Sequence, residues 1–525
     1  ARSSAGTKAG AKVRESVAPA IPFRPITGFA EGIYYAQYSF WSQVKVDSIG
    51  LFKSVSLLVM LLLWVCLMGI DLKENVFGGP FGMEFYPTTG FILEDLRASR
   101  PLLLILAFYA AELAWRERST GVHPLIYTTP FPQTAFWGAK CFTMILLVMV
   151  FVSLNICIGL ILQFLAGYPR FEPAIYLSFY YYSGVPLALM GILMLLIQRL
   201  SPNKYVGLLL SILAVVALLF SRRLGIEHFL LRYAATPDLL FSDFNGFGHD
   251  TRAFALYMLY WFSWIGLLFF ILTGIRQKAG QWLASACLMS ALSVGGYIFY
   301  QTNVRQPYRS SDQLKEMKGN YEKKYKPYSR LPQPTIRTAK LLVDLYPDER
   351  RYQVKGTYEL KNNTSQPISK VLVWMDIESR TTLLSITNAE VEAHDAEFGH
   401  FWLRLKQPLL PAQQTTMNFA LDVSKSGFEK FNKEHSILEN GAYIELEKYV
   451  PRFGYAAHLE LEDADERKKQ GLLPQTPYFS DNGYELIDFE AIISTAPDQR
   501  VITTGELKNE WSQHNRRYFH YRTSQ

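Results

Sequence analysis

The histidines and cysteines of this chain do not fall at spacings that build a reactive site. The commonest zinc peptidase site needs two histidines one helical turn apart with a glutamate between them, as H-E-x-x-H, and that motif is absent. The nine histidines are dispersed, and none pairs with another at ligand spacing. The sequence therefore predicts no metal site. It also predicts no disulfide framework, because all four cysteines lie in apolar runs, where a thiol packs as a small hydrophobic group: Cys66, Cys141, Cys157 and Cys287.

Nucleotide chemistry is also missing from the sequence. The chain has no G-x-x-x-x-G-K-[ST] loop, whose backbone amides and lysine would cradle phosphates. We predict no catalytic residue and no cofactor-binding residue in this chain, so that ATP, if it drives the protein, is hydrolysed on a partner subunit. The formal charge of +7 is mild and its basic residues are scattered or flank apolar runs, which argues against nucleic acid as a partner.

One segment, Ala111 to Lys140, carries the densest functional signal. An apolar run ends in a tryptophan, charges of alternating sign follow, and a short amphipathic segment, Val122–Thr128, is stopped by prolines. A short helix in this position would project from two apolar helices at once. The alternative is a generic loop with flanking charges, its apolar residues resting on the membrane surface.

The elements around this segment are apolar runs of membrane-spanning length. Spanning takes roughly 20 mostly apolar residues, and seven runs qualify: Phe52–Ile70, Leu96–Trp115, Phe136–Ala166, Ala174–Gln198, Lys204–Phe220, Ala253–Ile275 and Gln281–Tyr300. Before them, Ile33–Phe52 mixes aromatic with polar residues and suits an interfacial amphipathic helix, or else the polar start of the first span.

The basic residues of the short loops give the orientation. With the amino end inside, the inner loops Arg116–Ala135, Arg199–Asn203 and Arg276–Gly280 hold a dense positive charge. The outer loops are longer and share their arginines with acidic residues. Because seven spans put the two ends of the chain on opposite sides, the soluble part is expected outside the cytoplasm.

The remaining chain divides into a linker, a connector and a strand-rich domain. Residues 1–30 begin with an Ala-, Gly-, Ser- and Lys-rich stretch and are expected to be a flexible linker. Residues 301–334 form a basic connector with a helix that starts from a cap at Ser310 or Ser311. Short alternating runs between turn residues predict a β-sheet domain over 335–525. The predicted fold class is thus an α-helical transmembrane bundle followed by an all-β soluble domain.

The loop at 111–140 resembles that of ABC-2 type permeases, and the resemblance extends loosely over residues 30 to 275. The resemblance implies an elbow helix before the first span, re-entrant outer helices at Ser221 to Arg252, and a coupling helix that docks on an ATPase subunit. The matching pattern also includes Gly138 and Lys140. The positions expected to form the ATPase-coupling loop are Glu112, Trp115, Arg116, Glu117, Arg118, Val122, Leu125, Ile126, Thr129 and Pro130.

The β-domain resembles the saddle-like amino-terminal domain of M1 family aminopeptidases, through Val343–Val371 and Thr503–Gln525. The permease usually has six spans; the seventh here would carry the β-domain outside. Together the two parts resemble bacterial fusions of an ABC permease with an M1 aminopeptidase, of which this chain would be an internal portion. The resemblance places zinc and its ligands in a catalytic domain beyond this chain, so no ligand is carried over.

These observations predict the transmembrane subunit of an ATP-driven exporter in a bacterial inner membrane, with an extracytoplasmic peptidase-like domain. The expected partners are an ABC ATPase, a second permease unit, the lipid membrane and a peptide substrate. One alternative is a membrane-anchored M1-type zinc aminopeptidase whose catalytic domain lies outside this chain. Another is a non-catalytic peptide-binding scaffold, since sheet edges accept extended chains. The sequence does not identify a cargo.

Overall fold

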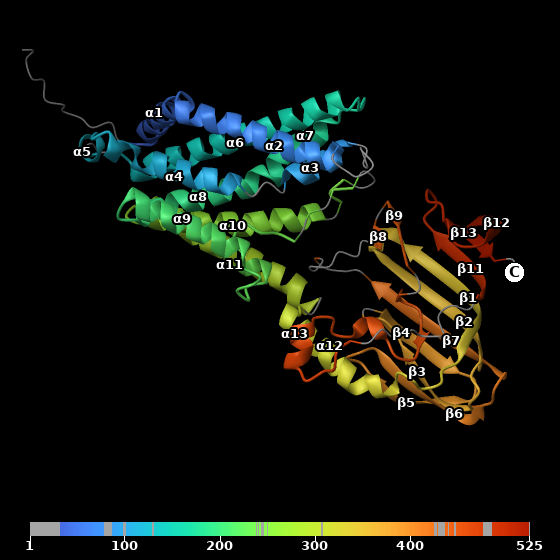
Figure 1. Ribbon diagram of the computed structural model, residues 1–525. Helices are drawn as coiled ribbons and strands as arrows, with labels where there is room; N and C mark the ends of the chain where they lie inside the picture. The colour runs from blue at the N-terminus through green and yellow to red at the C-terminus, as the bar shows by residue number, and fades with distance from the viewer. Residues whose placement is uncertain are drawn as a thin grey trace, which may run out of the picture.

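The computed structural model has a helical bundle at the amino-terminal side and a mainly β-sheet domain at the carboxyl-terminal side (Figure 1). The structure describes residues 32–77, 87–97, 101–128, 131–237, 239, 241–242, 246–248, 250–305, 308–377, 379–424, 428, 436–438, 440–445, 448–475 and 486–523. The predicted linker over residues 1–30 lies outside these described residues.

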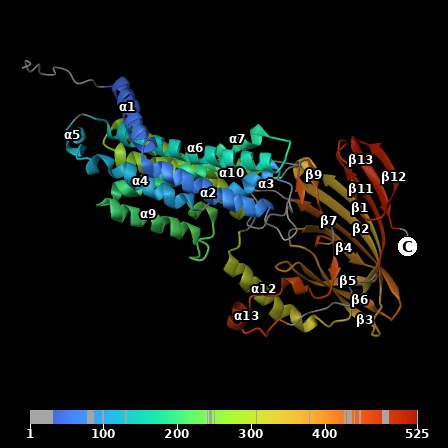
Figure 2. The same cartoon turned by 45° about the horizontal axis from the view of Figure 1, so that its top comes forward.

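The bundle consists of long apolar helices that run side by side (Figures 1 and 2). Its helices are α1 (Ile33–Phe52), α2 (Val55–Phe77), α3 (Thr89–Arg97), α4 (Leu102–Ser119), α5 (His123–Tyr127), α6 (Gln133–Leu165), α7 (Pro173–Tyr182), α8 (Gly184–Leu200), α9 (Lys204–Leu219), α10 (Asp250–Thr273) and α11 (Lys278–Phe299). A 3₁₀ turn, η1 (Phe229–Leu231), and a π-helical turn, η2 (Tyr300–Val304), complete the described helical part.

The number of spans differs from the seven that the sequence predicts. Among the described residues, five helices are long and apolar enough to cross a membrane, or six if one bent pair counts as a single span. The bent pair is α3 and α4, which meet at 56° where one straight span, Leu96–Trp115, was expected. The predicted span Lys204–Phe220 is helix α9, whose 16 residues cover only about 24 Å.

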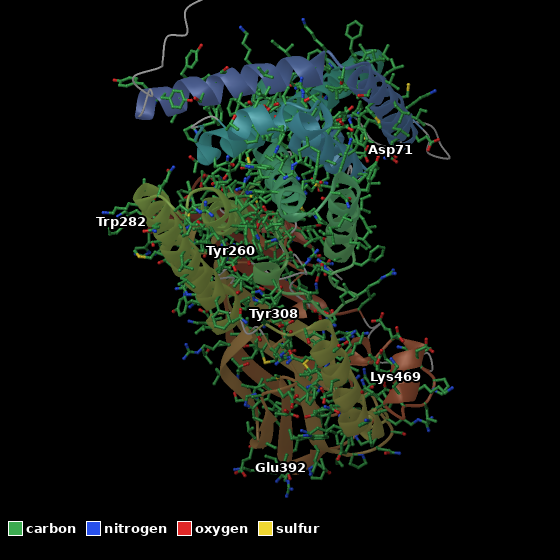
Figure 3. All side chains as sticks on the ribbon, turned by 90° about the vertical axis from the view of Figure 1, so that its left-hand side faces the viewer. Asp71, Tyr260, Trp282, Tyr308, Glu392 and Lys469 are labelled. Carbon is green, nitrogen blue, oxygen red and sulfur yellow. The ribbon has the colours of Figure 1, made fainter. Side chains whose placement is uncertain are left out.

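Helix α1 crosses the bundle instead of running along it (Figures 1 and 3). Ser54 separates it from α2, accepting a hydrogen bond from the amide of Leu57 at 3.3 Å. The exposed side chains of α1 are largely aromatic or aliphatic, as at Tyr34, which is 86% exposed, whereas Asp47 is fully buried. This inverted pattern fits a helix whose outer face meets lipid.

Two apolar clusters form the inside of the bundle. One joins α2, α3, α4 and α6 around fully buried side chains such as Trp64 and Phe151. The other joins α8, α10 and the segment after α9 around Tyr257. Helices α10 and α11 pack closely through small residues, with the Ser263 and Ser290 hydroxyls 2.9 Å apart. The last apolar helix therefore belongs to the bundle instead of standing apart as an anchor.

The connector is a helix that packs on the β-domain. Helix α12 (Ser311–Tyr325) starts from the predicted cap: the Ser310 hydroxyl accepts from the amide of Gln313, whose side chain accepts from the amide of Ser310. Buried Tyr321 and Tyr325 stack against His400 and Phe398 of the β-domain. Within this junction the Glu322 carboxylate receives two 2.7 Å hydrogen bonds from the Arg467 guanidinium.

The β-domain is built on a mixed sheet of seven strands in the order β12-β13-β11-β1-β2-β7-β4. These strands are β1 (Thr335–Tyr346), β2 (Arg351–Lys361), β4 (Ser379–Ile386), β7 (Gln414–Ser424), β11 (Asp488–Thr495), β12 (Glu506–Gln513) and β13 (Arg516–Arg522). Strand β11 lies parallel to β1, with Leu341 opposite Ala491, which joins the last part of the chain to the first strand of the domain.

A smaller sheet has the order β10-β3-β6-β5, and β8 pairs with β9 as a separate ribbon. The strands are β3 (Ile368–Trp374), β5 (Ala389–Asp395), β6 (His400–Leu409), β8 (Ile437–Leu438), β9 (Gly441–Ala442) and β10 (Arg452–Phe453), with a short helix α13 (Ala464–Lys469). Alternate residues of the two main sheets are buried against each other, as in Val354 and Val373. This packing gives the domain one apolar core.

Residues of the segment after α9 form hydrogen bonds with the start of the connector. The Glu227 carboxylate accepts from the amide of Ser311 at 2.8 Å, and the His228 ring lies 2.9 Å from the Asn303 side-chain oxygen. Tyr308 lies between the bundle and the β-domain in Figure 3. The connector thus contacts the bundle at one end and the β-domain at the other.

Candidate functional site

The predicted coupling segment forms the end of the bundle that lies farthest from the β-domain (Figures 1 and 2). Helix α4 ends at Ser119, the five-residue helix α5 follows, and α6 begins at Gln133. Pro124 is within the first turn of α5, where its missing N–H costs no helical hydrogen bond. The short helix α5 therefore lies between the long helices α4 and α6 in the chain.

Helix α5 presents apolar side chains to the outside. Leu125 is 70% exposed and Val122 is 41% exposed, while Ile126 is half-buried. The expected site residues Thr129 and Pro130 lie outside the described residues.

Two charged residues at the end of α4, Arg116 and Glu117, contact α1, whereas Arg118 is exposed. Arg116 Nη1 donates to the backbone carbonyls of Val46 at 3.0 Å and Asp47 at 3.2 Å. Glu117 is 7% exposed and accepts a 2.7 Å hydrogen bond from Lys140 Nζ. Arg116 was expected in the ATPase-coupling loop, and in the structure its guanidinium also holds α1 against α4.

Asp47, Arg116, Glu117 and Lys140 form what we term the charge cluster, which joins α1, α4 and α6. The Lys140 side chain is fully buried, and its Nζ also lies 3.7 Å from Asp47 Oδ2 and 2.7 Å from the carbonyl of Leu113. The second cation, Arg116 Nη1, lies 3.7 Å from Asp47 Oδ1. Two cations face two carboxylates, so the cluster is formally neutral.

Burial controls the electrostatics of this cluster. Desolvation raises the pKa of the Asp47 carboxyl above its ordinary value, and the ammonium of Lys140 opposes that rise. The Gln43 amide donates to both carboxylates, at 3.0 Å to Asp47 Oδ2 and 3.0 Å to Glu117 Oε1. Because removing one member of such a network strands a buried charge, the three helices are tied to one another.

Sequence reasoning missed Gln43 and Asp47 as site residues. They stand inside α1 and were interpreted only as signs that this helix lies at the membrane surface. A better signal was available: Asp47 is an acidic residue in an otherwise aromatic and aliphatic helix, and a buried partner is the usual reason for such a charge. Lys140 appeared in the family pattern but was not assigned to the site.

The other predicted residues tie α4 to α8 and α9. The indole of Trp115 donates to the Gln198 side chain at 3.0 Å, and the Arg118 guanidinium lies 4.4 Å from the Trp115 ring centre. Lys204 forms an ion pair with Glu112, and both side chains are partly exposed. The end of α4 therefore contacts α1, α6, α8 and α9, so that a force on α5 would reach all of them.

In the part of the chain that the structure describes, no group of three or more His, Cys, Asp or Glu side chains could hold a metal ion.

Comparison with known proteins finds distant structural similarity. No protein-family model matches the chain, and no curated protein matches it. Among solved structures, an M1 zinc metallopeptidase variant bound to a Tyr-Ser-Ala substrate, from Deinococcus radiodurans, matches 37% of this chain at 11% identity and a TM-score of 0.25. An M1 zinc metallopeptidase from the same organism matches 38% at 12% identity and a TM-score of 0.25. The matches span 40% and 42% of those chains, and TM-scores of 0.25 are too low to carry an argument about function.

Proposed function

We propose that the chain is the transmembrane subunit of an ATP-driven exporter in a bacterial inner membrane, energised by a separate ABC ATPase that docks on α5. The observation that carries this proposal is the exposed apolar surface at Val122 and Leu125, which follows Glu117 of the charge cluster within eight residues of the chain. An apolar helix face can enter a groove of a partner. The charge cluster would then pass a displacement of α5 to α1, α4 and α6.

The orientation follows the positive-inside rule. The α5 end of the bundle carries Arg116, Arg118, Lys140, Arg199 and Lys204, so we propose that it is cytoplasmic. The β-domain lies at the other end of the bundle (Figure 1), and we propose that it is extracytoplasmic. Ion pairs occur at both ends, as between Lys140 and Glu117 and between Arg97 and Glu94, so the assignment uses the number of basic residues in short loops and not the net charge.

A cysteine at exposed Asn363 tests this orientation. It should react with a membrane-impermeant thiol reagent in cells whose outer membrane has been permeabilised. Labelling that requires lysis of the inner membrane would place the β-domain in the cytoplasm and reverse the proposed orientation.

The docking role is tested by replacing Leu125 and Ile126 with glutamate. The double variant should lose copurification of the ATPase and stimulation of ATP hydrolysis, while membrane insertion stays unchanged because no span is altered. A matched control is the double variant Leu224→Glu with Ile226→Glu after α9, since these side chains are 63% and 40% exposed and lie outside the candidate spans. Full association of the double variant would assign the docking role to another loop, with residues 199–204 as the next candidate.

The alternative of a membrane-anchored aminopeptidase predicts a different result. Its catalytic domain would lie outside this chain, so it predicts that no ATPase copurifies with the chain. Hydrolysis of aminoacyl anilides by the purified chain, abolished by a chelator, would mean that the chain itself holds zinc ligands. We expect no such hydrolysis, because the sequence lacks a complete zinc ligand set.

A further inference from the structure

A cavity of about 230 Å³ opens between helices of the bundle. Two of the helices that line it, α3 and α7, lie toward the β-domain in Figure 1. It is lined from three places: the end of α3 and the start of α4 (Leu96, Arg97 and Leu102), the junction of α7 and α8, and the described residues among 234–239 after α9. Polar and apolar surface contribute almost equally to its wall, with Leu102, Leu187 and Phe254 among the apolar lining residues. Five of its thirteen lining residues are polar, so it can hold a polar group beside an apolar one: Arg97, Asn155, Tyr182, Ser183 and Thr236.

Local backbone features explain why the cavity exists. Pro186 has no N–H to donate to the carbonyl of Tyr182, so the helix is interrupted beside the cavity. Ala234 adopts a left-handed conformation with φ of 53°, which turns the chain back toward the bundle. The hydroxyl of Tyr233 then donates to the carbonyl of Leu189 at 2.9 Å and fixes this segment inside.

Arg97 is the cation of the cavity wall. Its Nη2 lies 3.3 Å from Glu94 Oε1, and the other oxygen of Glu94 accepts from the amide of Phe241 at 3.2 Å. Arg97 Nη1 is buried without a hydrogen-bond partner in the described structure. The Arg97 side chain as a whole is 23% exposed, so an oxyanion that enters the cavity can reach it and give Nη1 an acceptor.

Two uncharged polar side chains accompany Arg97. Asn155 is 3% exposed and lies ten residues before the end of α6, about 15 Å along the helix. Its Oδ1 accepts from the Trp64 indole at 2.8 Å, so its amide is held in place at the cavity. Ser183, 7% exposed, lines the same space. Donors from three parts of the bundle therefore line the same space.

We infer that this cavity binds the oxyanion head group of an amphipathic molecule, a phospholipid phosphate, with Arg97 as the ligand-binding cation and Asn155 and Ser183 as further donors. The planar guanidinium matches an oxyanion in geometry and charge. The volume fits a head group and not a whole lipid, so the acyl chains would lie outside the cavity against the apolar helices. This inference goes beyond the proposed function and requires no ATPase.

The test measures binding of phosphatidylglycerol to the full chain in phosphatidylcholine nanodiscs by native mass spectrometry. Arg97→Gln should weaken binding at least tenfold, whereas Arg223→Gln, at an exposed arginine near the same end of the bundle, should leave it within twofold. Glu94→Gln removes the carboxylate that competes for Arg97 and should strengthen binding. A merely structural role of the Glu94–Arg97 pair predicts weaker binding in both variants, which would overturn the inference.

A second variant tests whether a loss of binding could come from a loss of folding. Thr236→Phe keeps the charge of Arg97 but fills the cavity from its rim, and should also abolish phosphatidylglycerol binding while the unfolding temperature stays unchanged. Competition by soluble glycerol phosphate would mean that the phosphate oxyanion is sufficient for binding, whereas no competition would mean that the site needs the phosphodiester lipid. Equal loss of binding in Arg97→Gln and Arg223→Gln would mean that surface charge alone attracts the lipid, and the inference would fail.

Discussion

Replacing Lys140 with methionine should destabilise the bundle far more than replacing any exposed lysine. The change removes an ammonium that is fully buried and lies 2.7 Å from Glu117 Oε1 and 3.7 Å from Asp47 Oδ2. Two buried carboxylates are then left with Arg116 as the only cation of the cluster. Breaking a buried ion pair on one side costs roughly 3–5 kcal/mol, which we expect as the loss in free energy of unfolding.

The chain offers a matched control for this loss. Lys204→Met removes an ion pair with Glu112 in which the side chains are 31% and 43% exposed. Exposed pairs contribute roughly 0–1 kcal/mol because solvent screens them. Denaturant unfolding of the purified chain in detergent, followed by tryptophan fluorescence, would measure both variants. The double variant Lys140→Met with Glu117→Gln should recover part of the loss, since one of the stranded charges is gone.

The pH dependence gives an independent check with a defined sign. Burial raises the folded-state pKa of Asp47 above its unfolded value of 3.8, and loss of Lys140 removes an opposing influence. Between the unfolded and folded pKa the native state binds more protons, so stability falls as pH rises through that window. The defect of Lys140→Met should therefore be largest at pH 8 and shrink toward pH 5. A defect below about 1 kcal/mol at pH 8, equal to that of Lys204→Met, would refute the desolvated cluster.

Three further results are expected. Gly207→Ala should lower the free energy of unfolding by about 1 kcal/mol, because its Cβ would lie 2.1 Å from Gln198 Oε1, the acceptor of Trp115. In the same unfolding assay the control Gly69→Ala should be neutral or stabilising, because the new Cβ meets nothing within 4 Å. Glu322→Gln should destabilise the connector by roughly 3 kcal/mol, since it leaves the buried Arg467 without its carboxylate partner. The control Glu462→Gln, in an exposed pair with Lys318, should change the stability little. The rate of proteolysis within α12 measures both effects. Burial lowers the pKa of His400 to about 4, so the β-domain should lose stability, by up to roughly 3 kcal/mol, as pH falls from the unfolded value of 6.5 toward 4. Hydrogen exchange in β3 and β6 would measure that loss, and a His400→Gln variant with an unchanged slope would contradict the assignment.

The sequence by itself determined the division of the chain and the position of most elements. The apolar run Phe136–Ala166 became α6 (Gln133–Leu165), the strand-rich region began at Thr335, and the cap at Ser310 started α12. These features are local, because a helix span depends on a continuous apolar run and a cap depends on residues three apart. Such local signals can be recognised in the sequence without knowing which elements pack against them.

Only the tertiary structure decided what the charged residues contact and how the spans are interrupted. Arg116 and Asp47 are 69 positions apart, and nothing in their local patterns indicates that one holds the other. The bend between α3 and α4 and the cavity beside Arg97 likewise depend on residues from several helices. A buried charge is stable only where partners from other parts of the chain surround it. The sequence shows that such a charge must have partners, and only the folded structure shows which residues they are.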